Sequence, residues 1–251
     1  MKKISGNKLL VKALSEEQVD TIFGYPGACT IDISDELYKQ DYTKVILPRQ
    51  EVALVHEADA YARSTGKVGV CLVTSGPGAT NLVTGLATAY YDSVPLVCFT
   101  GQVSRHLIGN DAFQEVDIVG ITRSICKYGI TVQKREDLGR IIKEAFYIAR
   151  TGRPGPVLID IPKDVTANLS EYQKVEIDVT DIQRKKIDED EIETAVKMIQ
   201  RAKKPYIFVG GGAVLSGASE SLVEFAHKID APVADSLMGK GAFPGTDELY
   251  S

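Results

Sequence analysis

The fold is decided by residues 68–78, which read VGVCLVTSGPG. The first part of this stretch is a near-continuous apolar run, which is typical of a β-strand buried on both faces and therefore of a parallel sheet. The glycines and the proline break the strand, and residues 79–91 then have the periodicity of a helix. We therefore expect a strand that enters a helix through a tight turn, the repeating unit of an α/β fold.

The same unit recurs on both sides of this stretch. Strands are predicted at residues 21–25, 45–47, 94–100, 128–132 and 157–161. Helices are predicted after the N-cap Ser5 and at residues 30–40, 51–63 and 138–150. This alternation predicts an open, wound, mostly parallel sheet with helices on both faces, and we assign residues 1–164 to this first domain.

Composition excludes several classes of function. The net charge is −5 and the basic residues are scattered, so there is no patch for nucleic acid or for an anionic membrane surface. No apolar stretch approaches the roughly 18 residues of a membrane span, and residues 1–6 lead into no signal-peptide core. The cysteines are far apart and are expected to be reduced, mostly buried thiols of a cytoplasmic protein: Cys29, Cys71, Cys98 and Cys126.

Glu51 follows the strand at residues 45–47 and begins a helix. It is therefore expected at the carboxyl edge of the sheet, where open α/β folds bind ligands. A carboxylate partly shielded beside the apolar face of that helix could donate or share a proton near neutral pH. The alternative is an ordinary acid in the first helical turn, stabilised by the helix dipole.

Two glycine-containing turns should open at the same edge as Glu51. Residues 24–27 (GYPG) end the first strand, and residues 75–81 (SGPGATN) end the third. Glycine allows a ligand or another backbone to approach closely, and the start of a helix offers free N–H groups. Neither turn matches a GxGxxG or Walker sequence, and each alone is equally well explained as a tight structural turn. Their convergence with Glu51 favours a ligand site.

Two further segments supply candidate substrate contacts. The loop at residues 109–115 holds Phe113 beside Gln114, which suits a small polar substrate but also fits a solvated loop with one anchoring ring. Lys163 follows the last strand and so reaches the same edge, where it could meet an acidic substrate or be an ordinary exposed lysine. No metal site is predicted in this chain, because its histidines lack ligand spacing: His56, His106 and His227.

A second domain is predicted after a polar segment without helical periodicity. We interpret residues 165–187 as a linker between domains. Residues 188–251 then repeat the α/β pattern, with a glycine turn at residues 210–212 after a short strand. So short a sheet would leave an unpaired edge and an uncovered face, so we expect only the start of a second domain.

Taken in order, the motifs of the chain resemble those of thiamine-diphosphate-dependent acetolactate synthases. The matching strings are FGYPG at residues 23–27, LPRxE at 47–51, HxADxYAR at 56–63, SGPGATN at 75–81, DAFQE at 111–115, GRPGPVLID at 152–160, PKD at 162–164 and LMGxGAFP at 237–244. The first half alone would also fit the pyruvate oxidase and decarboxylase relatives. Phe113, Gln114 and Lys163 favour acetolactate synthase.

The resemblance implies that the first domain binds the pyrimidine ring of thiamine diphosphate. In the family, the glutamate that matches Glu51 hydrogen-bonds this ring and helps to remove the proton from the thiazolium C2. Pyruvate is then decarboxylated and joined to a second 2-keto acid, pyruvate or 2-oxobutanoate. Substrate contacts are implied for Phe113, Gln114 and Lys163. The residues implied along the cofactor cleft are Pro26, Gly27, Pro77, Asn81 and Gln114.

The second domain resembles the Rossmann-like central domain of the family, which holds FAD in a structural role. The positions that match FAD contacts are Arg153, Gly210, Gly211, Gly212, Met238 and Gly239. The family also uses Mg²⁺, held by a third domain with a Gly-Asp-Gly…Asn signature that this sequence lacks. A homodimer or higher homo-oligomer and a small regulatory subunit are implied as partners.

Several alternatives stay open. Gln50 stands where the family commonly has histidine, and Ala28 stands where a second glycine is common, so the substrate preference is open. Without the Mg²⁺–diphosphate half, the chain is expected to be inactive alone, as the N-terminal part of a large subunit or as one half of a split enzyme. A non-catalytic dimerising module is the remaining interpretation.

Overall fold

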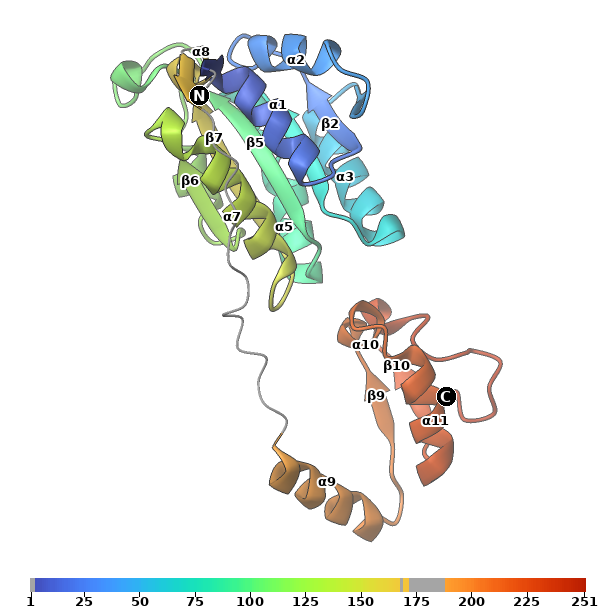
Figure 1. Ribbon diagram of the computed structural model, residues 1–251. Helices are drawn as coiled ribbons and strands as arrows, with labels where there is room; N and C mark the ends of the chain where they lie inside the picture. Colours follow the sequence, from blue (N-terminus) through green and yellow to red (C-terminus); the bar gives the residue numbers. More distant parts are fainter. Residues whose placement is uncertain (1–2, 168, 172–187) are drawn as a thin grey trace. The chain divides into compact units, whose positions relative to one another are not determined.

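The computed structural model describes residues 3–167, 169–171 and 188–251. The chain divides into two compact units, Met1–Asp178 and Val179–Ser251 (Figure 1). No helix among the described residues is long and apolar enough to cross a membrane.

A six-stranded sheet forms the centre of the first unit, with the strand order β3-β2-β4-β5-β7-β6. Its strands are β2 (Thr21–Tyr25), β3 (Lys44–Ile46), β4 (Gly69–Val73), β5 (Leu96–Gln102), β6 (Tyr128–Thr131) and β7 (Pro156–Pro162). Every pairing in this sheet is parallel. The central strands β4, β5 and β7 are buried along their whole length, as their apolar runs predict.

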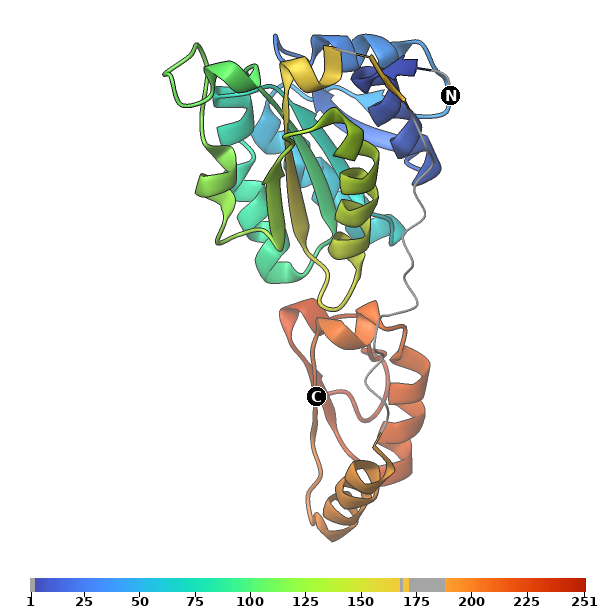
Figure 2. The same cartoon turned by 60° about the vertical axis from the view of Figure 1, so that its left-hand side comes forward.

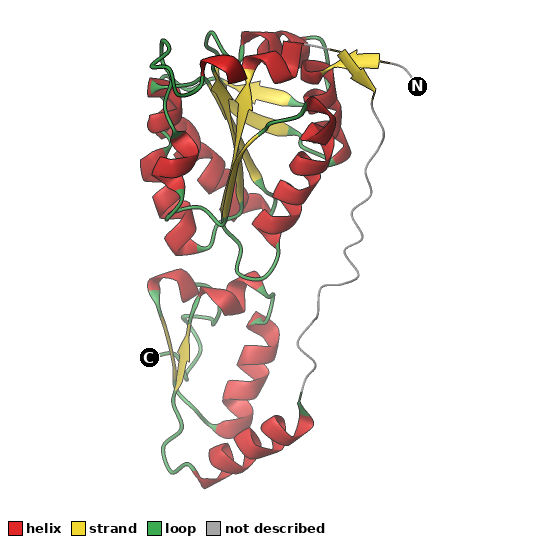
Figure 3. Cartoon of the chain, turned by 90° about the vertical axis from the view of Figure 1, so that its left-hand side faces the viewer, coloured by secondary structure: helices red, strands yellow, loops and turns green. Residues whose placement is uncertain are grey.

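Helices cover both faces of this sheet (Figure 2 and Figure 3). Alternate residues of β4 supply the two cores, because successive side chains of a strand point to opposite faces. Val70 and Leu72 pack with α1 (Gly6–Glu16), α2 (Ile31–Tyr38) and α7 (Leu138–Arg150). Cys71 and Val73 pack with α3 (Glu51–Thr65) and α5 (Val83–Asp92). The predicted open, wound, mostly parallel α/β fold is therefore confirmed.

Local signals set the ends of several helices. Ser5 caps α1, since its Oγ accepts a hydrogen bond from Lys8 N at 3.3 Å. Gly66 ends α3 in the left-handed conformation, at φ +72°. The helix predicted at residues 79–91 begins earlier, because Pro77 is well suited to a first helical position. It is divided into α4 (Pro77–Thr80) and α5.

The first unit continues past residue 164, where the sequence placed its end. Residues of α8 (Lys163–Ala167) pack into the sheet domain, with Val165 fully buried. β8 (Leu169–Glu171) pairs antiparallel with β1 (Lys3–Ser5). These contacts join segments far apart in the sequence, so local polarity gave no sign of them. Residues 168 and 172–187 of the predicted linker lie outside the described residues.

The stretch at residues 101–123, which includes the predicted loop at residues 109–115, contains short helical segments. Gly101 and Gln102 extend β5, and η1 (Arg105–Leu107) and α6 (Ile118–Thr122) follow. Asp117 caps α6, because its carboxylate accepts a hydrogen bond from Gly120 N at 2.9 Å. A further 3₁₀ turn, η2 (Arg135–Asp137), precedes α7.

The second unit repeats the α/β pattern on a small scale. Its elements are α9 (Glu189–Arg201), β9 (Ile207–Val209), α10 (Gly211–Leu215), α11 (Ser219–Ile229), β10 (Val233–Asp235) and η3 (Leu237–Gly239). β9 and β10 pair in parallel. The core of this unit is small and centres on Val209, Val233 and Phe243, while Phe208 of β9 is 71% exposed.

Candidate functional site

The carboxyl ends of the parallel strands open at one edge of the large sheet. The chain passes from β2 to β3 and then places β4 on the other side of β2, so the strand order reverses between β2 and β4. Ligands of open α/β sheets bind in the crevice outside such a switch point. The turns at residues 26–28 and 74–78, which follow β2 and β4, lie at this crevice.

Glu51 lies at this edge as the first residue of α3, which follows β3. The residue is half-buried, and its carboxylate oxygen Oε2 accepts a hydrogen bond from Asn81 Nδ2 at 2.9 Å. Asn81 directly follows α4, so this bond connects the helix after β3 to the turn after β4. The carboxylate is therefore held at the switch point instead of extending freely into solvent.

The other oxygen of Glu51 faces a space left by a glycine. A Cβ atom on Gly78 would lie 3.5 Å from Glu51 Oε1 and 3.0 Å from Thr74 Cγ2. In the part of the chain that the structure describes, Oε1 has no hydrogen-bond partner. One carboxylate oxygen is thus fixed by Asn81, and the other is available to a ligand that occupies the space beside Gly78.

The turns after β2 and β4 meet at Thr74. A Cβ on Gly27 would lie 2.5 Å from Thr74 Cβ, so the close approach of the two turns requires glycine there. Thr74 Oγ1 accepts a hydrogen bond from Cys29 N at 3.3 Å, and Ser75 Oγ lies 3.3 Å from Cys29 Sγ. The convergence of these turns with Glu51, expected from the sequence, is present.

Lys163 also reaches this edge. It is the first residue of α8, and its Nζ donates a hydrogen bond to the carbonyl oxygen of Ala28 at 3.0 Å. The side chain is half-buried and ties the end of β7 to the turn after β2. Ala28, one of the two departures from the family pattern, therefore contacts a predicted site residue through its backbone.

Gln114 packs against the turn after β4. A Cβ on Gly76 would lie 2.8 Å from Gln114 O, and both residues have left-handed backbone, at φ +59° for Gly76 and φ +58° for Gln114. Phe113 is 85% exposed, so its ring is at the edge but is not packed. The structure thus brings the Gln114 backbone to the Glu51 side of the sheet, together with the turn that holds Pro77 and Asn81.

Glu115 folds this loop on itself, a role that sequence reasoning missed. Its carboxylate accepts hydrogen bonds from the backbone N–H groups of Gly109 and Ala112. These hydrogen bonds hold the pKa of Glu115 below its ordinary value, and the bond from Gly109 has the larger effect. The only sequence signal was an acidic residue a few positions after a glycine.

A second missed residue is Asp160, in the middle of an otherwise apolar strand. It is 1% exposed and accepts hydrogen bonds from Thr100 Oγ1 at 2.7 Å, from Gln102 Nε2 at 3.1 Å and from Thr131 Oγ1 at 3.1 Å. Burial raises the pKa of Asp160 to about 6, although these three hydrogen bonds oppose the rise. An acid inside the string VLIDIP was the available signal.

In the second unit, the glycine turn after β9 packs against the segment after β10. A Cβ on Gly211 would lie 3.1 Å from Met238 Cβ, and a Cβ on Gly239 would overlap the carbonyl oxygen of Val209. Among the described residues, no atom lies within 4 Å of the position of a Cβ added to Gly210 or Gly212. The matched FAD positions of this unit are therefore neighbours at one edge of its small sheet.

Arg153 belongs to the first unit and lies before β7, at the amino edge of the large sheet. Its guanidinium donates hydrogen bonds to Ser93 Oγ at 2.7 Å and to the carbonyl oxygen of Tyr91 at 2.7 Å. These contacts hold the C-terminal end of α5, where a cation interacts favourably with the helix dipole.

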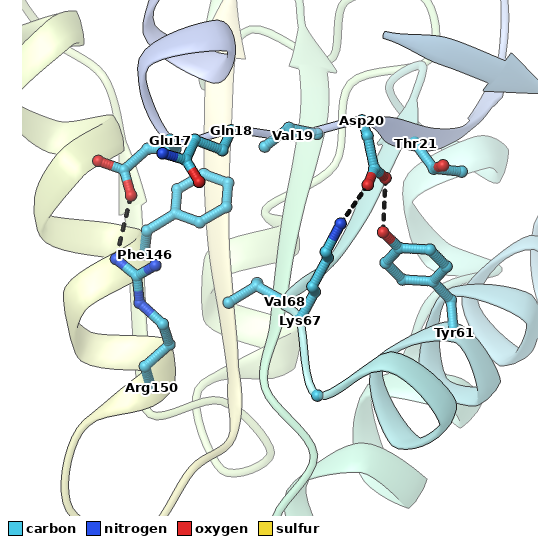
Figure 4. Close-up of a pocket in the computed structure, with 11 residues that line it drawn as sticks. Glu17, Gln18, Val19, Asp20, Thr21, Tyr61, Lys67, Val68, Phe146 and Arg150 are labelled. Carbon is cyan, nitrogen blue, oxygen red and sulfur yellow. Dashed lines mark hydrogen bonds and ion pairs between the residues drawn. The ribbon is translucent and has the colours of Figure 1, made fainter.

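A pocket of about 270 Å³ also lies at the amino edge of the large sheet (Figure 4). Its carboxylates are paired: Asp20 binds Lys67 and the hydroxyl of Tyr61, and Glu17 binds Arg150 at 3.0 Å. The hydrogen bonds from Lys67 and Tyr61 lower the pKa of Asp20 to about 2. None of the predicted site residues lines this pocket, and its charges are matched within the protein.

The four cysteines are free thiols, and Cys71, Cys98 and Cys126 are buried as expected. Burial raises the pKa of Cys126 to about 12, so this thiol is uncharged at neutral pH. Among residues 3–167, 169–171 and 188–251, no group of three or more His, Cys, Asp or Glu residues is arranged to hold a metal ion.

Two protein-family models match the chain. The model of the N-terminal thiamine pyrophosphate-binding domain of thiamine pyrophosphate enzymes matches residues 4–121. The model of the central domain of the same enzymes matches residues 192–251. The two matches fall on the two structural units.

Similar curated proteins cover nearly the whole chain. The acetolactate synthase large subunit of Haemophilus influenzae is 49% identical over 100% of this chain and 44% of its own length. That of Parasynechococcus marenigrum is 51% identical over 98% of this chain and 41% of its own length. The acetolactate synthase isozyme 3 large subunit of Escherichia coli is 46% identical over 98% of this chain and 44% of its own length. The chain thus spans less than half the length of these relatives.

Proposed function

The chain belongs to the thiamine pyrophosphate enzymes, among the acetolactate synthase large subunits, and we propose that it supplies the pyrimidine-side half of an active site. Thiamine pyrophosphate is thiamine diphosphate under its other name. The proposed reaction is the decarboxylation of pyruvate and the condensation of the product with a second molecule of pyruvate or with 2-oxobutanoate.

One observation carries the proposal: Glu51 is held by Asn81 on one oxygen and faces the space beside Gly78 with the other. A flat aminopyrimidine ring requires a hydrogen-bonding carboxylate at its edge and no side chain in its plane. The glycine at position 78 and the half-buried carboxylate meet both requirements, so the residues present fit the cofactor.

When bound, thiamine diphosphate supplies the electron sink that lets a 2-keto acid lose carbon dioxide. With the ring bound, Glu51 would share a proton with it through Oε1, because Oε2 is already occupied by the Asn81 amide. The half-buried position of Glu51 weakens competition from water for that proton, and this favours general acid–base chemistry. Pro26, Gly27 and Pro77 lie in the turns at the same edge and would line the space beside the ring.

The substrate is proposed to bind on the side of Lys163 and Gln114. The Lys163 ammonium donates one hydrogen bond to Ala28 and retains further N–H groups for a keto-acid carboxylate. Gln114 supplies an amide and Phe113 an apolar wall. The exposed ring of Phe113 is proposed to be covered when two copies of the large subunit assemble, since an exposed phenylalanine at a ligand edge favours such a contact.

The remaining assignments rest on the family alone. Mg²⁺ and the diphosphate are proposed to bind a part of the assembled enzyme other than these two units. FAD is proposed to bind in a structural role at Gly210, Gly211, Gly212, Met238 and Gly239 of the second unit. A small regulatory subunit is the proposed protein partner.

The proposal is tested by the products formed from pyruvate. The assembled enzyme that contains this chain is supplied with thiamine diphosphate, Mg²⁺ and pyruvate, with and without 2-oxobutanoate. Acetolactate, and the mixed product when 2-oxobutanoate is present, support the proposal. Free acetaldehyde as the main product would instead indicate a decarboxylase, and acetyl phosphate or acetate an oxidase.

A further inference from the structure

The loop that carries Phe113 and Gln114 is closed at its base by one side chain. Gln102, the last residue of β5, is 3% exposed. Its Oε1 accepts a hydrogen bond from Val103 N at 2.9 Å, and its Nε2 donates one to Val116 O at 2.9 Å. A single amide therefore joins the first and last residues of the loop at residues 103–116.

Asp160 is placed to orient the Gln102 amide. The strands β5 and β7 are neighbours, and Asp160 Oδ2 accepts a hydrogen bond from Gln102 Nε2 at 3.1 Å. An ionised carboxylate can only accept, so only the NH₂ group of the amide can face it. With the amide turned over, Gln102 Oε1 would oppose the carboxylate, and both loop hydrogen bonds would be lost.

The carboxylate is itself held by neutral groups. Thr100 Oγ1 donates to Oδ1 at 2.7 Å and Thr131 Oγ1 to Oδ2 at 3.1 Å. In the part of the chain that the structure describes, no lysine or arginine pairs with Asp160, and the charge of Asp117, of the same sign, opposes its ionisation. A buried acid without a cation is costly to retain, which points to a role beyond packing.

We propose that Gln102 and Asp160 are positioning residues: Gln102 clasps the base of the loop, and Asp160 orients the Gln102 amide so that the loop presents Gln114 at the Glu51 edge. Among the described residues, the side-chain hydrogen bonds of Gln102 and Asp160 go to neither Glu51 nor the turn after β4. They act through the loop, whose Gln114 backbone packs against Gly76. The role of Gln114 at this edge rests on the proposed function. The hold of Gln102 on the base of the loop, called the clasp below, can be measured without catalysis.

A second anchor of the loop provides an internal comparison. Arg105 donates hydrogen bonds from its backbone N at 3.0 Å and from Nε at 2.7 Å to the carboxylate of Asp164. This ion pair holds the early part of the loop against α8, while Gln102 holds both ends. Loss of the clasp is therefore expected to loosen residues 109–117 more than residues 104–107.

Hydrogen–deuterium exchange of this chain tests the clasp directly. Gln102→Leu removes the amide and Asp160→Leu removes its acceptor, each by an apolar side chain of comparable length, and exchange at residues 109–117 should rise by about tenfold or more. Asp160→Asn keeps an oxygen for Gln102 Nε2 and should stay within about threefold of wild type. Residues 21–25 of β2 should exchange as in wild type in all three variants.

Two results would overturn the inference. The first is a folded Gln102→Leu variant in which residues 109–117 exchange as slowly as in wild type. This result is decisive even if the Asp160→Leu variant does not fold. The second is an equal rise in exchange at residues 109–117 in Asp160→Asn and Gln102→Leu. It would mean that an oxygen acceptor at position 160 does not orient the Gln102 amide.

In the assembled enzyme, Gln102→Leu is expected to raise the KM for pyruvate by about tenfold and to change kcat by less than about threefold, because the loop supplies binding. A lower kcat at unchanged KM would contradict the clasp. If wild-type enzyme forms no acetolactate, the proposed function fails while the exchange result stands on its own.

Discussion

Asn81 Nδ2 lies 2.9 Å from Glu51 Oε2, and this hydrogen bond joins the start of α3 to the turn after β4 across the switch point of the sheet. It leaves Oε1 as the oxygen that faces the space beside Gly78. The carboxylate is thus oriented by a neutral amide that adds no opposing charge.

Asn81→Leu removes this orientation and leaves the carboxylate half-buried with both oxygens unpaired. We expect a loss of about 1–2 kcal/mol in the free energy of unfolding, since the bond goes to a charged group. Acetolactate formation by the assembled enzyme should fall about tenfold or more, because the carboxylate is no longer fixed in position. Denaturant titration and a product assay measure the two effects. Thr84→Val, on the exposed side of α5, is the control and should change neither.

Gly78→Ala places a methyl group beside Glu51 Oε1, at 3.5 Å, and 3.0 Å from Thr74 Cγ2. The variant should fold, because alanine favours the helix and Thr74 need shift only slightly. The affinity of the assembled enzyme for thiamine diphosphate should fall by about tenfold or more, since the methyl group occupies the space assigned to the ring. Calorimetric titration with the cofactor measures this change.

The matched control for this change is Gly129→Ala in β6, where an added Cβ meets Val119 Cγ1 at an ordinary 3.4 Å. It should bind the cofactor as wild type does. Equal affinity in Gly78→Ala and wild type would show that the ring lies elsewhere.

Asp160 makes stability depend on pH in the direction opposite to that of an ion-paired acid. Its pKa is about 6 in the folded chain and 3.8 when unperturbed. Between these values the unfolded chain has lost the proton that the folded chain retains, so stability falls as pH rises through this window and levels off above it. The difference corresponds to about 3 kcal/mol, caused mainly by burial of the charge.

Asparagine at position 160 cannot ionise, so the stability of the Asp160→Asn variant should not fall in this way as the pH rises. The free energy of unfolding of the first unit is measured for wild type and the variant between pH 4 and 8. The difference between them should change by about 2–3 kcal/mol in favour of the variant as the pH rises from 4 to 8. A difference that does not change with pH would mean that Asp160 is ionised in the folded chain throughout this range.

Lys163→Met breaks the hydrogen bond to Ala28 O and removes a cation from the edge of the sheet. The KM for pyruvate of the assembled enzyme should rise by about tenfold or more, because the keto-acid carboxylate loses a charged donor. Lys163→Arg keeps the charge and should recover part of this loss. Steady-state kinetics measure both, and a pyruvate KM unchanged in Lys163→Met would exclude the assigned contact.

Much of the fold could be predicted because its signals are local. The apolar run before Ser75 predicted a strand buried on both faces, and β4 is buried throughout. The position of Glu51 between a strand and a helix placed it at the carboxyl edge, and the structure agrees. Both inferences need only neighbouring residues and the geometry of a parallel sheet.

The features that were missed depend on partners distant in sequence. Asp160 and Gln102 meet because β7 lies beside β5, and no periodicity reveals that neighbour. In the same way, β8 was assigned to a linker because its partner, β1, is at the other end of the unit. The Asn81 contact to Glu51 was expected only as part of a cofactor cleft, since nothing local links the two residues.

The most direct test of the account is the rate at which the C2 proton of thiamine diphosphate exchanges with deuterium in the assembled enzyme, for wild type and Glu51→Gln. Glutamine keeps the size of the side chain and an oxygen for Asn81 Nδ2, but it cannot share an acidic proton. We predict that exchange slows by about 100-fold or more in the variant, the usual contribution of a positioned acid or base. Exchange at the wild-type rate in a Glu51→Gln enzyme that still binds the cofactor would contradict the role assigned to Glu51.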